Sequence, residues 1–226
     1  MVRAVSTIAP IRTYHPRQGR LSGRHRAALA DLSPRLIVAV EGGQLDFAEV
    51  FGRVAPVVLE IGSGMGEATA AMAAANPDRD YLAVEVHKPG VANLLALVDH
   101  AGLVNVRVAE GDALDLVRAR LGPASLAAIH VFFPDPWPKP RHHKRRLVTA
   151  ANVALLRSRL APGGVLHCAT DHADYAALMR TVLAADPELS IVDSVEAVRP
   201  VTKFEQRALD AGRSVTDLAA TRTGRS

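Results

Sequence analysis

The chain has a single cysteine, Cys168, among its 226 residues, so no disulfide can form within it. Cys168 lies inside an apolar run, which indicates a buried structural thiol rather than a nucleophile. A chain without a disulfide framework fits a reducing compartment, and we therefore expect a cytoplasmic protein.

Long apolar segments and metal-ligand spacings are also missing from the sequence. No apolar run approaches the roughly 20 residues that span a bilayer, and residues 1–20 lack the apolar segment of a secretory signal. His142 and His143 are adjacent and no cysteine accompanies them, which is not a metal-binding spacing. We expect no membrane contact and no metal, and the sequence leaves the choice between a monomer and a homodimer open.

The composition is that of a globular domain. Hydrophobic residues make up 49% and charged residues 22% of the chain, which argues against disorder. The net charge is only +4 although the pI is 9.6, so local basic clusters indicate a face for an anionic partner. We predict a mobile basic arm over residues 1–30 that ends in a short helix, one domain over 31–218 and a disordered tail over 219–226. An unstructured tail with incidental charge is the alternative for the first 30 residues.

Strand and helix patterns alternate along the domain. Strands are predicted at 57–61, 81–86, 104–109, 126–133, 165–169 and 189–195. Helices are predicted at 67–75, 91–100, 114–121, 145–160 and 175–185. This alternation predicts parallel βαβ units and a doubly wound α/β sheet.

The stretch from His130 to Arg146, HVFFPDPWPKPRHHKRR, changes from apolar to acidic to strongly basic. Prolines follow Asp135 and Trp137 and keep both out of a helix. A rigid carboxylate at the end of a parallel strand lies where open α/β sheets bind their ligands. For Trp137, stacking on a base and packing in a half-buried position are equally open.

The first turn of the alternation reads EIGSGMGE, residues 60–67. Its glycines permit a tight bend close to a ligand, but the spacing is not that of dinucleotide enzymes. Glu60 and Glu67 suit a cationic ligand such as S-adenosylmethionine better than a pyrophosphate. A plain turn is the alternative.

Acidic residues end the next strands as well. Glu85 lies 85 − 62 = 23 residues after Gly62, the offset of a carboxylate that binds a ribose diol. Asp112 suits an adenine amino group, a helix cap, or both. Asp171 most simply caps the next helix or else faces the pocket. The segment around 202–205 resembles an edge strand by composition.

Six segments together resemble the bacterial tRNA (guanine-N7-)-methyltransferases over residues 15–218. They are EIGSGMGE at 60–67, VEVH at 84–87, GDA at 111–113, FFPDPWPKPRHHKRR at 132–146, TD at 170–171 and TKFE at 202–205. The resemblance implies a Rossmann-like class I methyltransferase, with a mostly parallel seven-stranded sheet flanked by helices. It also implies methyl transfer from S-adenosyl-L-methionine to N7 of the guanine at position 46, in the tRNA variable loop.

Residue roles follow from the same resemblance. The implied cofactor-binding residues are Glu60, Gly62, Gly64, Glu85, Asp112 and Asp135, and Asp135 is also the implied catalytic residue. The implied substrate-binding residues are Lys139, Asp171, Thr202, Lys203, Phe204 and Glu205. Contacts with RNA phosphates are implied for Arg141, His142, Lys144 and Arg145, within a basic loop that runs to Arg146, and for Arg17 and Arg20 of the N-terminal arm. The chain departs from the family pattern at His172, Ala208, Arg213 and Thr216.

Three other functions compete with this interpretation. An NAD-dependent oxidoreductase conflicts with the glycine spacing and with Glu60. A non-catalytic RNA-binding protein conflicts with four acidic strand ends. Methyl transfer to another acceptor stays open on the residues alone, because a fold does not determine a substrate.

Overall fold

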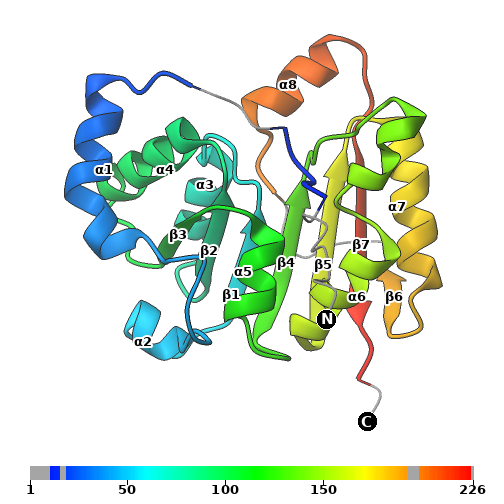
Figure 1. Cartoon of the computed structure of the whole chain (residues 1–226), viewed down its shortest axis with the longest axis horizontal. Coiled ribbons are helices and arrows are strands. Elements are labelled where there is room, and N and C mark those ends of the chain that lie inside the picture. The colour runs from blue at the N-terminus through cyan, green and yellow to red at the C-terminus, as the bar shows by residue number, and fades with distance from the viewer. Residues whose placement is uncertain (1–10, 16–18, 193–198, 225–226) are drawn as a thin grey trace, which may run out of the picture.

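Seven strands form one sheet in the order β3-β2-β1-β4-β5-β7-β6 (Figure 1). The computed structural model describes residues 11–15, 19–192 and 199–224. The strands are β1 (Val57–Ile61), β2 (Asp80–Glu85), β3 (Val106–Glu110), β4 (Leu126–Phe132), β5 (Leu160–Thr170), β6 (Leu189–Val192) and β7 (Thr216–Arg222). The first five pair in parallel, and β7 runs antiparallel to β5 and β6. The predicted doubly wound, mostly parallel sheet is confirmed.

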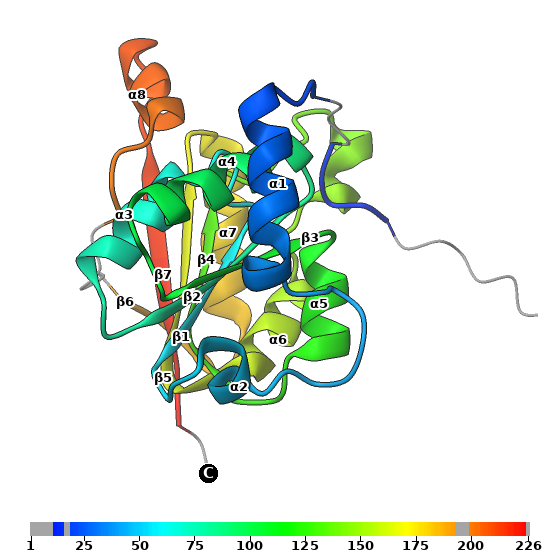
Figure 2. The same ribbon diagram turned by 90° about the vertical axis from the view of Figure 1, so that its left-hand side faces the viewer.

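Helices cover both faces of the sheet (Figure 2). One face carries α1 (Gly23–Leu36), α3 (Glu67–Ala75) and α4 (Lys88–His100). The opposite face carries α5 (Ala113–Arg120), α6 (Ala150–Arg159) and α7 (Ala173–Ala185). The short α2 (Phe47–Phe51) precedes β1, and α8 (Lys203–Asp210) rises above the carboxyl edge of the strands in both views.

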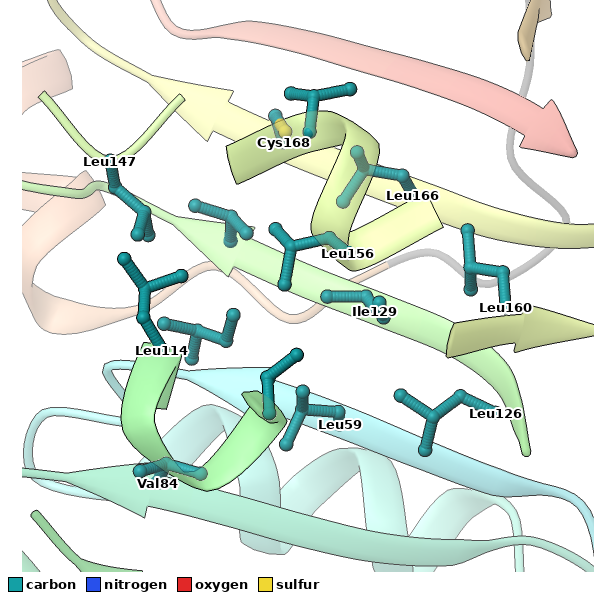
Figure 3. Close-up of a cluster of buried hydrophobic side chains, with 14 of the residues drawn as sticks. Leu59, Val84, Leu114, Leu126, Ile129, Leu147, Leu156, Leu160, Leu166 and Cys168 are labelled. Atoms are coloured by element: carbon teal, nitrogen blue, oxygen red, sulfur yellow. The ribbon is translucent and has the colours of Figure 1, made fainter. Parts of the chain in front are cut away.

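Two apolar cores follow from the alternation of side chains along each strand. In β1, Leu59 packs with the layer of α5, α6 and α7, whereas Val58 packs with the layer of α1, α3 and α4. Figure 3 shows the first core, where Leu59, Ile129 and Leu156 meet. All three are at most 1% exposed, and burying each contributes about 1.5–3 kcal/mol. Cys168 is buried there too, as predicted, and burial raises the pKa of its thiol to about 12.

The structure differs from several predicted elements. Helix α1 begins at Gly23, continues to Leu36 and contacts α4, so it extends beyond residue 30, where the arm was expected to end. The helix predicted over 145–160 begins later, because α6 covers only Ala150–Arg159 after its cap Thr149, and the residues before it form a 3-10 helix, η1 (Pro140–Arg145). The segment at 202–205 begins a helix rather than an edge strand. Strand β7 continues to Arg222, so residues 219–222 belong to the sheet and not to a tail.

Within the described ranges, no helix combines the length and the apolar character that a membrane span requires.

Candidate functional site

The direction of the strand order reverses between β1 and β4, and a cavity of about 300 Å³ opens there at the carboxyl ends of the strands. This is the position at which open α/β sheets bind ligands. Four predicted site residues line the cavity together: Gly62, Gly64, Glu85 and Asp135. The cavity also has an apolar wall, which includes Ile61, Val84, Val86, Phe132 and Leu147.

The glycine loop after β1 forms the floor of the cavity. Gly62, Gly64 and Gly66 have φ values of 78°, 58° and 77°, a region that side chains with a Cβ rarely adopt. Gly66 is also packed tightly, because a Cβ there would lie 2.5 Å from Leu94 Cβ. Glycine is therefore required in this loop by backbone conformation and by close packing.

Glu85 joins the glycine loop to the next helix. Its Oε2 accepts a hydrogen bond from the Gly64 N–H at 2.7 Å, and its Oε1 accepts one from the His87 N–H at 2.7 Å. The residue is only 7% exposed, so these bonds compensate for burying the carboxylate. Each oxygen retains a further lone pair, so Glu85 can still accept hydrogen bonds from the hydroxyl groups of a ligand in the cavity.

Glu60 lies behind the loop and is not among the residues that line the cavity. It is 2% exposed, and its Oε2 accepts a hydrogen bond from Thr69 Oγ1 at 2.6 Å. Burial raises the pKa of Glu60 to about 7, with a smaller contribution from Glu85 and an opposing one from the Thr69 hydrogen bond. Glu60 thus connects β1 to α3 behind the glycine loop, and its predicted contact with the cofactor stays a prediction.

Asp112 caps α5, where its carboxylate accepts a hydrogen bond from the Leu114 N–H at 2.8 Å. Its neighbours Gly111 and Ala113 line the first cavity, whereas Asp112 itself lines a second one of about 390 Å³. Thr13 and Tyr14 line both cavities and lie between them. The capping role is therefore observed, and the adenine role stays a prediction.

Asp135 lies in the loop that follows β4, on the wall of the first cavity. Phe133 and Trp137 on either side have φ values of 51° and 44°, which are costly for residues with a side chain. The Phe133 N–H donates to the Ala169 carbonyl at 2.8 Å and ties the loop to β5. The prolines and these constrained residues together hold Asp135 at the cavity.

Residues 11–15 of the arm lie across this loop. The His15 main-chain N–H donates to Asp135 Oδ2 at 2.7 Å, and the His15 ring stacks on Trp137 with 3.8 Å between centroids. Trp137 Nε1 donates to the Thr13 carbonyl at 3.2 Å. Trp137 is 2% exposed and so is a packing residue in this structure, not a free platform for a base. The predicted Arg17 lies outside the described residues, and Arg20 is exposed.

The basic loop forms η1 and divides into exposed and buried members. Arg141 and Lys144 are exposed, His142 is partly exposed, and Arg145 lies over the Trp137 ring at 4.4 Å from its centroid. Lys139 precedes the 3-10 helix and is exposed. Arg146 is only 2% exposed, so the expectation that the phosphate-binding loop includes it is wrong.

Asp171 does not cap the helix that follows it. His172 caps α7 instead, and its Nδ1 accepts a hydrogen bond from the Tyr175 N–H at 3.4 Å. Asp171 forms an ion pair with Arg213 at 3.0 Å. Two of the departures from the family pattern, His172 and Arg213, are therefore a helix cap and the partner of Asp171.

The segment at 202–205 is held by a buried ion-pair network. Thr202 caps α8 and accepts from the Glu205 N–H at 3.1 Å, while the structure describes Lys203 and Phe204 only as helical positions. Arg199 donates to both carboxylate oxygens of Glu205 and, at 2.8 and 2.9 Å, to both of Asp217. Arg199 also lies 5.1 Å from the ring centroid of Phe133, so the network reaches the loop that carries Asp135.

Sequence reasoning missed two contributors to this region, Arg199 with Asp217 and residues 13–15 of the arm, and it assigned Arg146 to the wrong surface. Arg199 stands three residues before Thr202, and this proximity was its only signal. Arg146 borders the buried pair Leu147 and Val148, a weak hint that it also faces inward.

The residues of the first cavity fit S-adenosylmethionine. Glu85 and Asp135 are carboxylates on its wall, which suits a cationic ligand, and the apolar residues suit an adenine ring. The glycine loop allows close approach of a ligand to the backbone. The cavity volume of about 300 Å³ lies at the lower end of the range for ligand pockets.

Comparison with known proteins gives one consistent answer. Residues 54–218 match the family model described as a putative methyltransferase. The tRNA (guanine-N(7)-)-methyltransferase of Nitrosospira multiformis is 51% identical over 92% of this chain and 93% of its own length. The enzyme of the same name from Thiobacillus denitrificans is 50% identical over the same shares.

Solved structures agree on the fold. The 16S rRNA methyltransferase KamB matches with a TM-score of 0.58 and 17% identity, over 80% of this chain and 95% of its own. TrmN from Thermus thermophilus matches with a TM-score of 0.53 and 16% identity, over 88% of this chain and 48% of its own. Because the family model matches residues 54–218 and these relatives are about half identical along nearly their whole length, this chain belongs to the tRNA (guanine-N(7)-)-methyltransferase family.

Proposed function

We propose that this chain transfers a methyl group from S-adenosylmethionine to N7 of a guanine in tRNA, and that this guanine is position 46 in the variable loop. Relatives that share half of its residues carry the name of this activity. One observation carries the proposal in the structure: Asp135 shares a single cavity with the glycine loop and Glu85. The basic loop begins a few residues further along the chain.

In this proposal Gly62, Gly64 and Glu85 hold the cofactor, and Glu60 and Asp112 support that site from behind and beside it. The cofactor supplies an electrophilic methyl group. Guanine N7 has an in-plane lone pair and no proton, so the enzyme requires no general base to free the nucleophile. Its main task is to align N7 with the methyl carbon and the sulfur, which is catalysis by positioning.

Asp135 is the proposed catalytic residue. A carboxylate that accepts the guanine N1–H and amino group stabilises the positive charge that grows on the ring. Asp135 suits this role because the His15 N–H and the rigid loop hold its carboxylate at the cavity. Lys139, Asp171 and residues 202–205 are the proposed contacts of the guanine or its nucleotide.

The tRNA backbone is proposed to bind the exposed cations of the basic loop, with further contributions from the arm. The proposed phosphate contacts are Arg141, His142, Lys144 and Arg145, with Arg17 and Arg20 of the arm. Binding through phosphates releases counterions, so the affinity for tRNA falls as salt rises.

Methyl incorporation into an unmodified tRNA transcript tests the proposal. We expect label from the cofactor to enter the transcript and chain cleavage at N7-methylguanine to locate it at position 46. Label in protein and none in RNA would instead support transfer to another acceptor. Binding of tRNA without any transfer would support a non-catalytic protein.

A further inference from the structure

The guanidinium of Arg146 is buried, whereas the other cations of the basic loop are exposed or partly exposed. It is 2% exposed, although it directly follows the partly exposed Arg145. An arginine buried to this degree cannot reach an RNA phosphate without leaving its place in the fold. Its environment must therefore explain why a cation stands at this position.

Two acceptors in different directions hold the guanidinium. Arg146 Nε donates to the Pro136 carbonyl at 2.9 Å, and Nη2 donates to Asp174 Oδ2 at 2.5 Å. The guanidinium carbon lies 4.8 Å from the ring centroid of Tyr175, which is fully buried. The Arg146 hydrogen bond lowers the pKa of Asp174, which keeps this partner ionised.

The contact with Pro136 falls one residue after Asp135. Pro134 and Pro136 restrict φ on either side of the carboxylate, but proline leaves its own carbonyl free to rotate about ψ. Trp137 then has a φ of 44°, an unfavourable conformation that needs support from its surroundings. The hydrogen bond from Arg146 to the Pro136 carbonyl fixes the peptide unit between Pro136 and Trp137.

We propose that Arg146 is a positioning residue for methyl transfer. By holding the Pro136 carbonyl it fixes the orientation of the loop and keeps the Asp135 carboxylate at its place in the cavity. The inference rests on the proposed role of Asp135. It assigns Arg146 to the catalytic loop and not to the tRNA surface.

The fork of arginine suits this task better than the single ammonium of lysine. One planar group bonds Pro136 from Nε and Asp174 from Nη2 while its central carbon lies over the Tyr175 ring. Lysine keeps the charge but offers one compact head that cannot reproduce both directions and the stacking. R146K therefore removes the geometry while it retains the cation.

The experiment compares R146K with two matched variants. D174N removes the negative charge of the other partner of Arg146, and Y175F removes the hydroxyl that accepts the Val148 N–H at 3.0 Å. Both change a neighbour of the guanidinium but leave the Pro136 contact in place. Folded fraction and Tm are measured for each, and rates are expressed per folded molecule.

We expect R146K to lower kcat by roughly 10- to 100-fold, the cost of a misplaced catalytic group. KM for tRNA and its salt dependence should stay close to wild type, since no phosphate contact is lost. D174N and Y175F should keep most of kcat even where Tm falls. If kcat instead follows Tm across the three variants, Arg146 is merely structural. If R146K flattens the salt dependence, Arg146 is a phosphate ligand, and either result overturns the proposal.

Fluorescence gives a readout that does not depend on methyl transfer. Trp137 is the only tryptophan of the chain, is buried, and follows Pro136 directly. We expect R146K to shift its emission to the red and to expose it to acrylamide, whereas Y175F leaves both unchanged. R146Q repeats the measurement should R146K fold poorly. An unchanged emission in folded R146K or R146Q would overturn the positioning role, even if the proposed reaction proved wrong.

Discussion

Replacing Asp135 by asparagine removes the charge of the proposed catalytic group and replaces one of its acceptor oxygens by an NH2 donor. The amide has the same shape, and its oxygen still accepts the His15 N–H that donates to Asp135 Oδ2 at 2.7 Å. The loop is held independently by the hydrogen bond from Phe133 to Ala169 and by the one from Arg146 to Pro136. D135N therefore removes the negative charge and one of the two acceptor oxygens while the loop stays in place.

The magnitude follows from the charge that develops on the ring. A carboxylate about 5 Å from a unit positive charge, at an effective dielectric constant of about 20, contributes about 3 kcal/mol. That energy corresponds to roughly a 100-fold loss in kcat. Asp135→Ala also removes the acceptor for the guanine N–H groups, so it should nearly abolish turnover.

The assay is steady-state methyl transfer to a tRNA transcript, with the affinity for S-adenosylhomocysteine measured in parallel. We expect cofactor affinity to fall much less than kcat in both variants, because Glu85 and the glycine loop remain. A kcat for D135N close to that of wild type would refute the electrostatic reasoning. An equal loss of rate and cofactor affinity would make Asp135 a binding residue only.

Three further predictions concern the charges around the site. The pKa of Glu60 is raised from 4.5 to about 7 in the native state, so between these pH values the native protein keeps a proton on Glu60 that the unfolded chain has lost. The contribution of Glu60 to stability therefore declines as pH rises from about 4.5 to 7. E60Q lacks that decline, so its free energy of unfolding, measured with denaturant, should rise by up to about 3 kcal/mol relative to that of wild type between pH 4 and pH 8. A difference in unfolding free energy that stays constant over this pH range would contradict the raised pKa. R199M leaves buried Glu205 without its partner and should cost about 3–5 kcal/mol of unfolding free energy, with a lower Tm; an unchanged Tm would show that the network does not hold α8. R141A should lower the slope of log affinity for tRNA against log salt by about 1, whereas an unaltered slope would remove Arg141 from the phosphate surface.

Much of the site was predictable because strand ends carry it. Glu85 and Asp135 terminate strongly apolar segments, and parallel strands bring their carboxyl ends to one edge. The glycine loop was predictable for the same reason, since positive φ values leave a glycine signature. These features depend on local sequence and on a simple rule of sheet topology.

The remaining features depend on contacts between distant residues. Strand β7, TDLAATR, has a weak local preference for a strand and forms only because β5 and β6 flank it. Arg146 looks like its neighbours in the basic run, and only the approach of Asp174 and Pro136 reveals its burial. The arm reaches Asp135 across 120 residues of sequence, a contact that no local pattern encodes.

The most direct test of the central claim uses a tRNA transcript whose position 46 is 7-deazaguanosine. This base keeps the N1–H and amino edge proposed to contact Asp135 but lacks the N7 lone pair. We predict that the enzyme binds this tRNA as tightly as the normal transcript and transfers no methyl group to it. Methyl transfer at the normal rate would contradict the account, because the acceptor would then be another atom.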